Sequence, residues 1–275
     1  MDSDLSLCGE EIRKTDHDQF ICGLFVPDEQ RNVFYALQVF NAETQRIRDL
    51  VQEPHLGLFR LQWWRDVVDA LYEGKSSQVE NGTHKEIVDV IANAEIPKPL
   101  FERYFNARAF DMEDHAHDDM AALLRYAEAT GGTIAEIKTT AIEVVTTEAH
   151  IKIGIAQTLY DIIRSLAFQA RKGRCKLPQA LIKKHGLDLK TFMELKADES
   201  LKACVRDLVS EITNQLEQAR NINAKPDGVL LSNIAIEDYL KRLKKVDYDP
   251  FNPNIGNGRL KKQLTIAFRA WRGKY

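Results

Sequence analysis

IKIGIAQTLYDIIRSLAFQA, residues 151–170, has a pattern that predicts a helix with apolar side chains on almost every face. Such a helix belongs in the interior of a protein, yet this one carries Gln157, Asp161 and Arg164. An unpaired buried charge is strongly destabilising. Asp161 and Arg164, three residues apart, therefore predict either an internal ion pair or the lining of a cavity, and the spacing alone favours neither.

Apolar residues recur at helical spacings over much of the remaining chain. One helix should start at Asp28 and stop before Pro54, and a second should run from about Leu58 to Glu73. Further helices are expected over 84–94, 98–111, 115–130, 132–146, 148–171, 178–184, 188–194, 198–222, 234–244 and 258–273. No run alternates apolar and polar residues as a strand does. The expected fold class is all-α, with loops at 74–84 and 223–233 that are too short to separate domains.

Composition excludes several classes of protein. The 38 Lys and Arg nearly cancel the 41 Asp and Glu, so the chain lacks the basic balance of a nucleic-acid-binding protein. Its four cysteines, Cys8, Cys22, Cys175 and Cys204, form no CxxC pair, which argues against a zinc cage and a disulfide scaffold. No apolar run is long enough to span a bilayer, and the first residues look like neither a secretory signal nor a transit peptide. The common nucleotide, zinc-protease and serine-hydrolase motifs are absent.

An acidic cluster lies between residues 111 and 119. It consists of Asp111, Glu113, Asp114, His115, His117, Asp118 and Asp119. On a helix, Asp114 and Asp118 would share a face and could hold Mg²⁺. A solvated helix start, where acids are favoured by the helix dipole, accounts for the same residues and is the preferred interpretation.

Four segments resemble the squalene/phytoene synthase superfamily, the head-to-head prenyl synthases. The stretches FICGLFVPDEQRNVFYALQVFNAE and RLQWWRDVVDALYEG are similar to the first two helices of that family, and Tyr126 with Gly132 matches its Y-x(5)-G pattern. Residues 153–178 are similar to a later helix and the G-R-x-Y-L-P motif that follows it, with Arg164 and Arg174 in place and Gln157 close to register. The resemblance implies a single-domain isoprenoid-synthase-type helical bundle with a central cavity over residues 20–275, preceded by an N-terminal extension, 1–19.

The chain departs from the family where the enzymes carry two DxxxD motifs that bind Mg²⁺ and the substrate diphosphates. The first motif reads Gln45-Arg46-Ile47-Arg48-Asp49, and the second reads Ser165-Leu166-Ala167-Phe168-Gln169. Asp161 stands where the family has Asn. Because Mg²⁺ requires hard oxygen ligands, Asp49 facing Ser165 and Gln169 makes a poor metal site. Arg46 and Arg48 either hold an anion without metal or, as the preferred alternative, point to solvent.

These positions define the candidate site. We expect the degenerate diphosphate and cavity positions to be Gln45, Asp49, Tyr126, Gly132, Gln157, Asp161, Arg164, Ser165, Gln169 and Arg174. No catalytic residue, metal ligand or cofactor is expected, except Mg²⁺ if the chain is an enzyme after all.

The C-terminal third resembles one branch of the superfamily, which contains the mitochondrial respiratory complex I assembly factor and its bacterial relatives. The likeness is carried by IEDYLKRLKKVDYDPFNPNI and the terminal AWRGKY. The aspartate motifs are degraded in that branch too. The tail also carries basic residues beside an apolar stripe. Lys261, Lys262, Arg269 and Arg272 are its candidate patch for an anionic membrane or a protein partner.

The resemblance implies three hypotheses about function. The first is a non-catalytic protein of complex I assembly, peripheral to the inner membrane in the mitochondrial matrix or the bacterial cytoplasm, with complex I subunits or assembly factors as partners. The second is a Mg²⁺-dependent prenyltransferase of the squalene or phytoene synthase type, whose altered metal site recruits Asp49, Asp161 and the 111–119 cluster. The third is a protein that binds a prenyl lipid without turnover.

Overall fold

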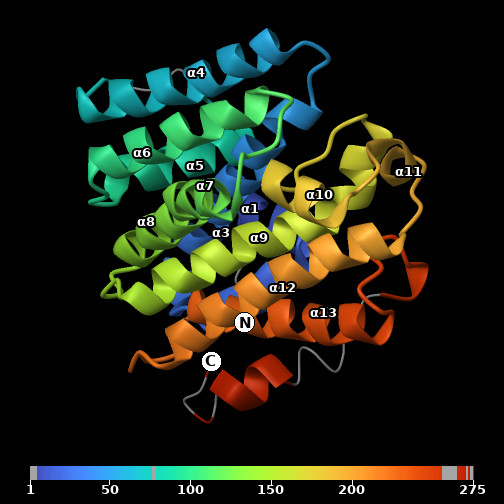
Figure 1. Ribbon diagram of the computed structural model, residues 1–275. Coiled ribbons are helices and arrows are strands. Elements are labelled where there is room, and N and C mark those ends of the chain that lie inside the picture. Colours follow the sequence, from blue (N-terminus) through green and yellow to red (C-terminus); the bar gives the residue numbers. More distant parts are fainter. Residues whose placement is uncertain (1–4, 76–78, 256–264, 271, 273–274) are drawn as a thin grey trace.

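The described residues of this computed structural model, 5–75, 79–255, 265–270, 272 and 275, form helices joined by short loops, with no strand among them (Figure 1). The all-α prediction is confirmed. The helices are α1 (Leu7–Thr15), α2 (His17–Gly23), α3 (Asp28–Arg46), α4 (Pro54–Tyr72), α5 (Gly82–Asn93), α6 (Lys98–Ala109), α7 (Met120–Ala127), α8 (Thr133–Ala141), α9 (Glu148–Arg171), α10 (Gln179–His185), α11 (Leu189–Met193), α12 (Glu199–Arg220) and α13 (Asn233–Lys245).

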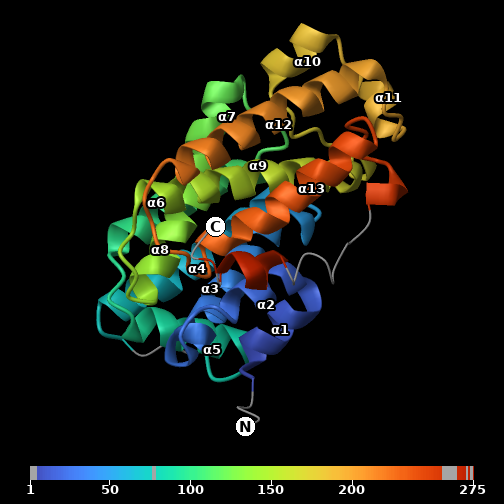
Figure 2. The same cartoon turned by 90° about the horizontal axis from the view of Figure 1, so that it is seen from below.

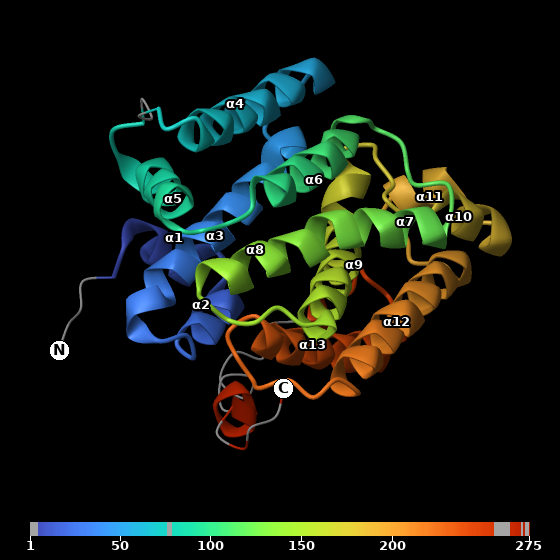
Figure 3. The same ribbon diagram turned by 90° about the vertical axis from the view of Figure 1, so that its left-hand side faces the viewer.

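Helix α9 lies at the centre of the bundle, as its sequence predicts. Figure 3 shows the row of α7 and α8 crossing α9, with α12 and α13 near the lower end of α9 in that view. Ala156, Leu159, Ile163 and Leu166 are fully buried in the core that α9 shares with α12 and α13. A second core is built mainly from α1, α3, α4, α5 and α6. The polar residues of α9 therefore lie where two apolar cores meet.

The link from α7 to α8 is a π-helical turn, Glu128–Gly132, that keeps the chain helical where the sequence predicted a break between helices. Gly131 in this turn lies directly against Gly154 of α9. A Cβ atom on Gly131 would lie 2.1 Å from the Gly154 carbonyl oxygen, and a Cβ on Gly154 would lie 2.1 Å from the Gly131 oxygen. Only glycine permits this approach, which fixes α7 and α8 against α9.

The N-terminal helices α1 and α2 were not predicted, although they pack on the bundle (Figure 2). Cys8 and Ile12 of α1 are buried in the same core as α3. The pattern was missed because α1 is short and mostly polar, and only its inner face is apolar.

Other element boundaries differ from the prediction. Pro54 begins α4 rather than stopping the preceding helix, because proline is well suited to the first turn of a helix. Helix α3 ends at Arg46, and the chain continues as a 3₁₀ turn, Ile47–Asp49. The helix expected over 115–130 begins only at Met120, where the Asp119 side chain caps it. Of the helix expected over 258–273, residues 265–270 are helical and most of the rest lies outside the described residues.

Candidate functional site

Two adjoining cavities lie between α3, α6 and α9. The first, of about 200 Å³, is lined by Arg46, Arg48, Asp49, Arg108, Asp111 and Arg174 among others and is called the arginine cavity. The second, of about 110 Å³, contains Lys138 and is called the lysine cavity. The two cavities share a wall of four polar residues, because both are lined by Gln45, Arg108, Thr158 and Asp161.

Asp49, the last carboxylate of the degenerate first motif, is engaged by the chain itself. Arg174 forms an ion pair with its Oδ1 atom, and Gln169 Nε2 donates to the same oxygen over 3.5 Å. Gln169 stands at the last position of the second motif, whose first position is Ser165. The Ser165 hydroxyl donates to the backbone oxygen of Ile162 at 2.9 Å and is thereby bound to its own helix. The Asp49 carboxylate is therefore bound by an arginine and an amide of the chain.

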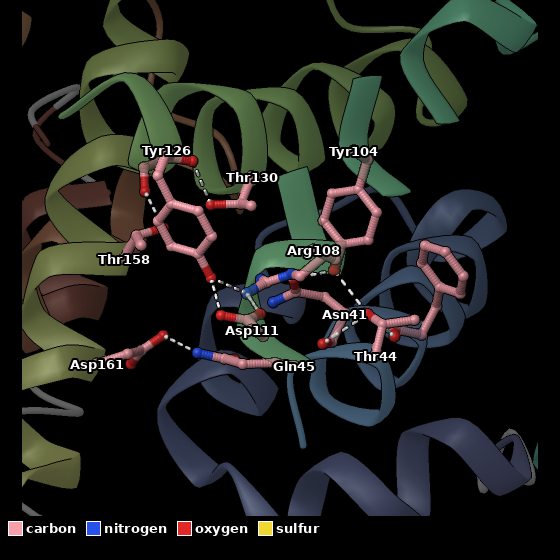
Figure 4. Close-up of polar contacts among 12 residues, drawn as sticks. Asn41, Thr44, Gln45, Tyr104, Arg108, Asp111, Tyr126, Thr130, Thr158 and Asp161 are labelled. Atoms are coloured by element: carbon pink, nitrogen blue, oxygen red, sulfur yellow. Dashed lines mark hydrogen bonds and ion pairs between the residues drawn. The ribbon is translucent and has the colours of Figure 1, made fainter. Parts of the chain in front are cut away.

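The contacts of Asp161 decide whether it forms an ion pair with Arg164 or lines a cavity, which the sequence left open. Its two oxygens accept hydrogen bonds from Gln157 Nε2, at 3.0 Å, and from Gln45 Nε2, at 3.3 Å. The contact with Gln45 is drawn in Figure 4. Arg164 instead lies exposed, with its guanidinium 5.1 Å from the centre of the Tyr160 ring. Asp161 therefore lines a cavity. Burial raises its pKa to about 6, against the opposing effect of the positive charge on Arg164.

The acidic segment is not a helix face, and that part of the prediction is wrong. Residues 113–119 form an irregular loop that precedes α7, so Asp114 and Asp118 do not share a helix. Asp114 accepts two hydrogen bonds from Arg48, at 2.9 and 2.5 Å, and lies 3.7 Å from Arg174. The hydrogen bonds from Arg48 hold the pKa of Asp114 below its usual range. The side chain of Arg48 thus binds a carboxylate of the chain, whereas the preferred expectation was that it points to solvent.

Asp111 belongs to a buried network around Arg108 (Figure 4). The Tyr126 hydroxyl donates to Asp111 Oδ1 at 2.6 Å, and Arg108 Nη1 lies 3.2 Å from Asp111 Oδ2. Arg108 also donates to the Tyr126 oxygen at 2.9 Å and to Asn41 Oδ1 at 3.3 Å. Burial raises the pKa of Tyr126 well above its usual value, so this hydroxyl keeps its proton. The network ties α3, α6 and α7 together at the cavity wall.

The residues present do not fit a Mg²⁺ site. No group of three or more His, Cys, Asp or Glu among the described residues could hold a metal ion. Asp49, Asp111 and Asp161 do line one cavity, but each is bound to an arginine or to amide groups of the chain. Three buried cavity atoms have no hydrogen-bond partner: Arg108 Nε, Arg174 Nε and Gln169 Oε1. Two of these are donors, which a cation would repel.

Eight of the ten predicted positions line one of the two cavities. The exceptions are Arg164, described above, and Gly132, which packs on Ile151 of α9. Sequence analysis missed Arg108 and Lys138. Arg108 follows Phe101, Tyr104 and Phe105 on the buried face of α6, and a cation on an apolar face is the signal that could have found it.

The tail patch is only partly described. Lys261 and Lys262 lie outside the described residues. Arg269 forms an ion pair with Glu237 of α13, with contacts of 3.0 and 3.2 Å, so its charge is used inside the protein. Arg272 is exposed, and its guanidinium lies 5.4 Å from the centre of the Phe268 ring.

Comparison with known proteins identifies the class to which this bundle and its cavity belong. The profile of squalene/phytoene synthases matches residues 12–266, and the chain belongs to that family. It is 27% identical to NADH dehydrogenase (ubiquinone) complex I, assembly factor 6, of Bos taurus, over 98% of this chain and 82% of that protein. It is 20% identical to the chloroplastic phytoene synthase of Daucus carota, over 94% of this chain and 68% of that one.

The fold is shared with solved structures of the family. A crystal structure of a dehydrosqualene synthase in complex with ligand superimposes with a TM-score of 0.78 at 17% identity, covering 96% of this chain and 94% of that one. The predicted isoprenoid-synthase-type bundle is therefore confirmed. No helix in the described part of the chain is both long and apolar enough to cross a membrane.

Proposed function

We propose that this protein acts in the assembly of respiratory complex I and does not catalyse prenyl transfer. The observation that carries the proposal is the ion pair of Arg174 with Asp49. A metal-binding motif would need this carboxylate to be free for the metal, and here an arginine binds it. Its similarity over nearly the whole chain to proteins named complex I assembly factor 6 supports the choice of process. The partners would be complex I subunits or other assembly factors.

The test uses the organism that produces the protein. Disruption of the gene should lower the amount of assembled complex I on native gels and the NADH oxidation by isolated membranes. Expression of the wild-type chain or of Asp161→Asn should restore both, because the assembly role needs no metal-binding carboxylate in the cavity. Normal complex I levels after disruption would refute the proposal.

The enzyme alternative is supported by one observation, since Asp49, Asp111 and Asp161 line the same cavity. Titration of the protein with Mg²⁺ and a non-hydrolysable farnesyl diphosphate analogue, read by calorimetry, separates the two. We expect no Mg²⁺-dependent binding. Metal-dependent binding that Asp49→Ala abolishes, or conversion of farnesyl or geranylgeranyl diphosphate to a coupled product, would favour the prenyltransferase.

Contact with an anionic membrane surface fits the outer face of α4 better than the tail. Leu56, Phe59 and Trp63 follow one another at helical spacing and are 44%, 68% and 41% exposed. Exposed Arg46 and Arg60 line the same groove as Trp63, which also includes Glu11 and Glu43, and Arg60 lies on α4 itself. Apolar and aromatic side chains beside arginines are typical of surfaces that lie in the lipid headgroup region. This surface would place the protein at the inner membrane, on the matrix or cytoplasmic side.

Sedimentation with vesicles tests this surface. Phosphatidylcholine vesicles containing phosphatidylglycerol should bind the wild type, and Phe59→Ser with Arg60→Ser should lower the bound fraction severalfold. Arg272→Ser should leave it nearly unchanged. Equal binding by all three proteins, or no binding to the anionic vesicles, would exclude α4 as the contact.

A further inference from the structure

The lysine cavity has a lining that is poorly suited to a hydrocarbon chain. Four glutamines line it, Gln19, Gln38, Gln45 and Gln157, together with Asp16 and Asp161. Polar groups that lose their water to an apolar ligand gain no hydrogen bond in return, and this costs free energy for each group. A prenyl chain would therefore be a poor occupant, and a small polar molecule would be a good one.

Lys138 supplies a cation to this cavity and forms no ion pair within the described chain, although Asp16 and Asp161 line the same cavity. Its side chain comes from α8 and is 7% exposed. The Nζ atom donates to Gln38 Oε1, which is uncharged, and lies 5.2 Å from the centre of the Phe34 ring. The described chain places no carboxylate oxygen within 4.0 Å of Nζ, so Asp16 and Asp161 make no ion pair with it. Two of the three N–H donors of the ammonium group are thus left for another acceptor.

The charge on Lys138 persists near neutral pH despite its burial. Burial lowers the pKa of the ammonium group to about 8, while the negative charges of Asp16 and Asp161 act in the opposite direction. A buried cation that is hydrogen-bonded only to a neutral group is costly. The free energy of such a site falls when an anion enters and accepts the remaining hydrogen bonds.

We propose that the lysine cavity binds a small organic monoanion through its carboxylate, with Lys138 as the cationic anchor. A carboxylate offers two acceptor oxygens, which match the two free donors of the ammonium group. The nearby charges of Asp16 and Asp161 disfavour a multiply charged anion such as phosphate. The volume of about 110 Å³ admits a molecule of a few carbon atoms. This ligand site goes beyond the proposed assembly role and does not depend on it.

Calorimetry with propionate and its uncharged analogue propionamide tests the site on the full chain. Propionate should bind the wild-type protein, and propionamide should bind about tenfold more weakly or not at all. Lys138→Met keeps the length of the side chain and removes its charge. It should weaken propionate binding by about tenfold or more. Lys152→Met is the matched control, because Lys152 lies on α9 and lines neither cavity, and it should bind propionate as the wild type does.

Three results would overturn the proposal. They are the absence of propionate binding to the wild type at matched ionic strength, equal affinity of Lys138→Met and wild type, and tighter binding of the apolar alcohol farnesol than of propionate. If Lys138→Met does not fold, the comparison of propionate with propionamide on the wild-type protein decides the question alone. None of these measurements involves complex I, so failure of the ligand site and failure of the assembly role are told apart.

Discussion

Arg174 forms an ion pair with Asp49 although 125 positions of the sequence separate them. The pair joins the 3₁₀ turn after α3 to the segment that follows α9, at the edge of the arginine cavity. Arg174 is 6% exposed and has an Nε atom without a partner, so its charge depends on Asp49 and, at longer range, on Asp114. This ion pair therefore contributes to the stability of the fold.

Asp49→Ala should destabilise the protein markedly, because it leaves the buried guanidinium of Arg174 with only the distant contact to Asp114. The expected loss in the free energy of unfolding is on the order of 3 kcal/mol. Urea denaturation followed by circular dichroism measures it. Asp28→Ala is the control, since Asp28 pairs with Arg31 at the surface and is 87% exposed, and its cost should stay within about 1 kcal/mol. Similar losses for both variants would contradict the stabilising role.

Asp161 predicts a definite dependence of stability on pH. Its pKa in the folded protein is about 6, above the ordinary value, so folding favours the protonated form. The group costs nothing at pH below about 4, and its cost grows as the pH rises to about 6, reaching roughly 2–3 kcal/mol. Asp161→Asn should therefore be more stable than the wild type at pH 7, and this advantage should shrink towards pH 4.5. A difference that does not change with pH would argue against burial as the cause.

His117 should act in the opposite direction. Burial lowers its pKa to about 4, and its ring stacks on Phe110 with centroids 4.2 Å apart. A histidine that is neutral in the folded state contributes stability above its unfolded pKa, near 6.5, and this is lost as the pH falls towards 4. Proton NMR titration of the ring should give a midpoint below 5. A midpoint near 6.5 would place the ring in solvent.

Gly154→Ala should disrupt the contact between α9 and the π-helical turn. The new methyl group would lie 2.1 Å from the Gly131 oxygen, and both partners are backbone, so the helices must separate. We expect a loss of about 3 kcal/mol or more in the free energy of unfolding. Gly132→Ala is the comparison, because its nearest neighbour is a side-chain methyl of Ile151 at 3.1 Å and can move aside. The denaturation midpoints of the two variants show whether a clash with backbone, as in Gly154→Ala, costs more stability than a clash with a side chain, as in Gly132→Ala.

Sequence alone predicted the fold class and the long helices because the apolar periodicity of α3, α9 and α12 is strong. Helix α1 was missed, since its few buried residues, such as Cys8 and Ile12, produce little periodic signal in nine residues. Pro54 was assigned to a helix end rather than a helix start, because proline is compatible with both positions. Helix boundaries of this kind depend on tertiary contacts that no local pattern encodes.

The candidate site was predicted in its positions but not in its pairings. Spacing on α9 brought out Gln157 and Asp161, which are hydrogen-bonded to each other. It also offered Arg164 as a partner of Asp161, whereas the second hydrogen bond comes from Gln45 on another helix. The link between Arg48 and Asp114 was equally invisible, because it joins residues 66 positions apart. Lys138 could not be singled out from the sequence, because lysine is a common residue. Only its burial in the structure makes it unusual.

The π-helical turn at Glu128–Gly132 amounts to one extra residue within an otherwise continuous helix. If the same residues, Thr130 among them, were wound as an α-helix instead, everything that follows would rotate by about 100° relative to α7. Lys138, eight positions further on, would then turn away from the cavity without having been changed itself. The presence of a cation between the helices therefore depends on how a neighbouring turn is wound.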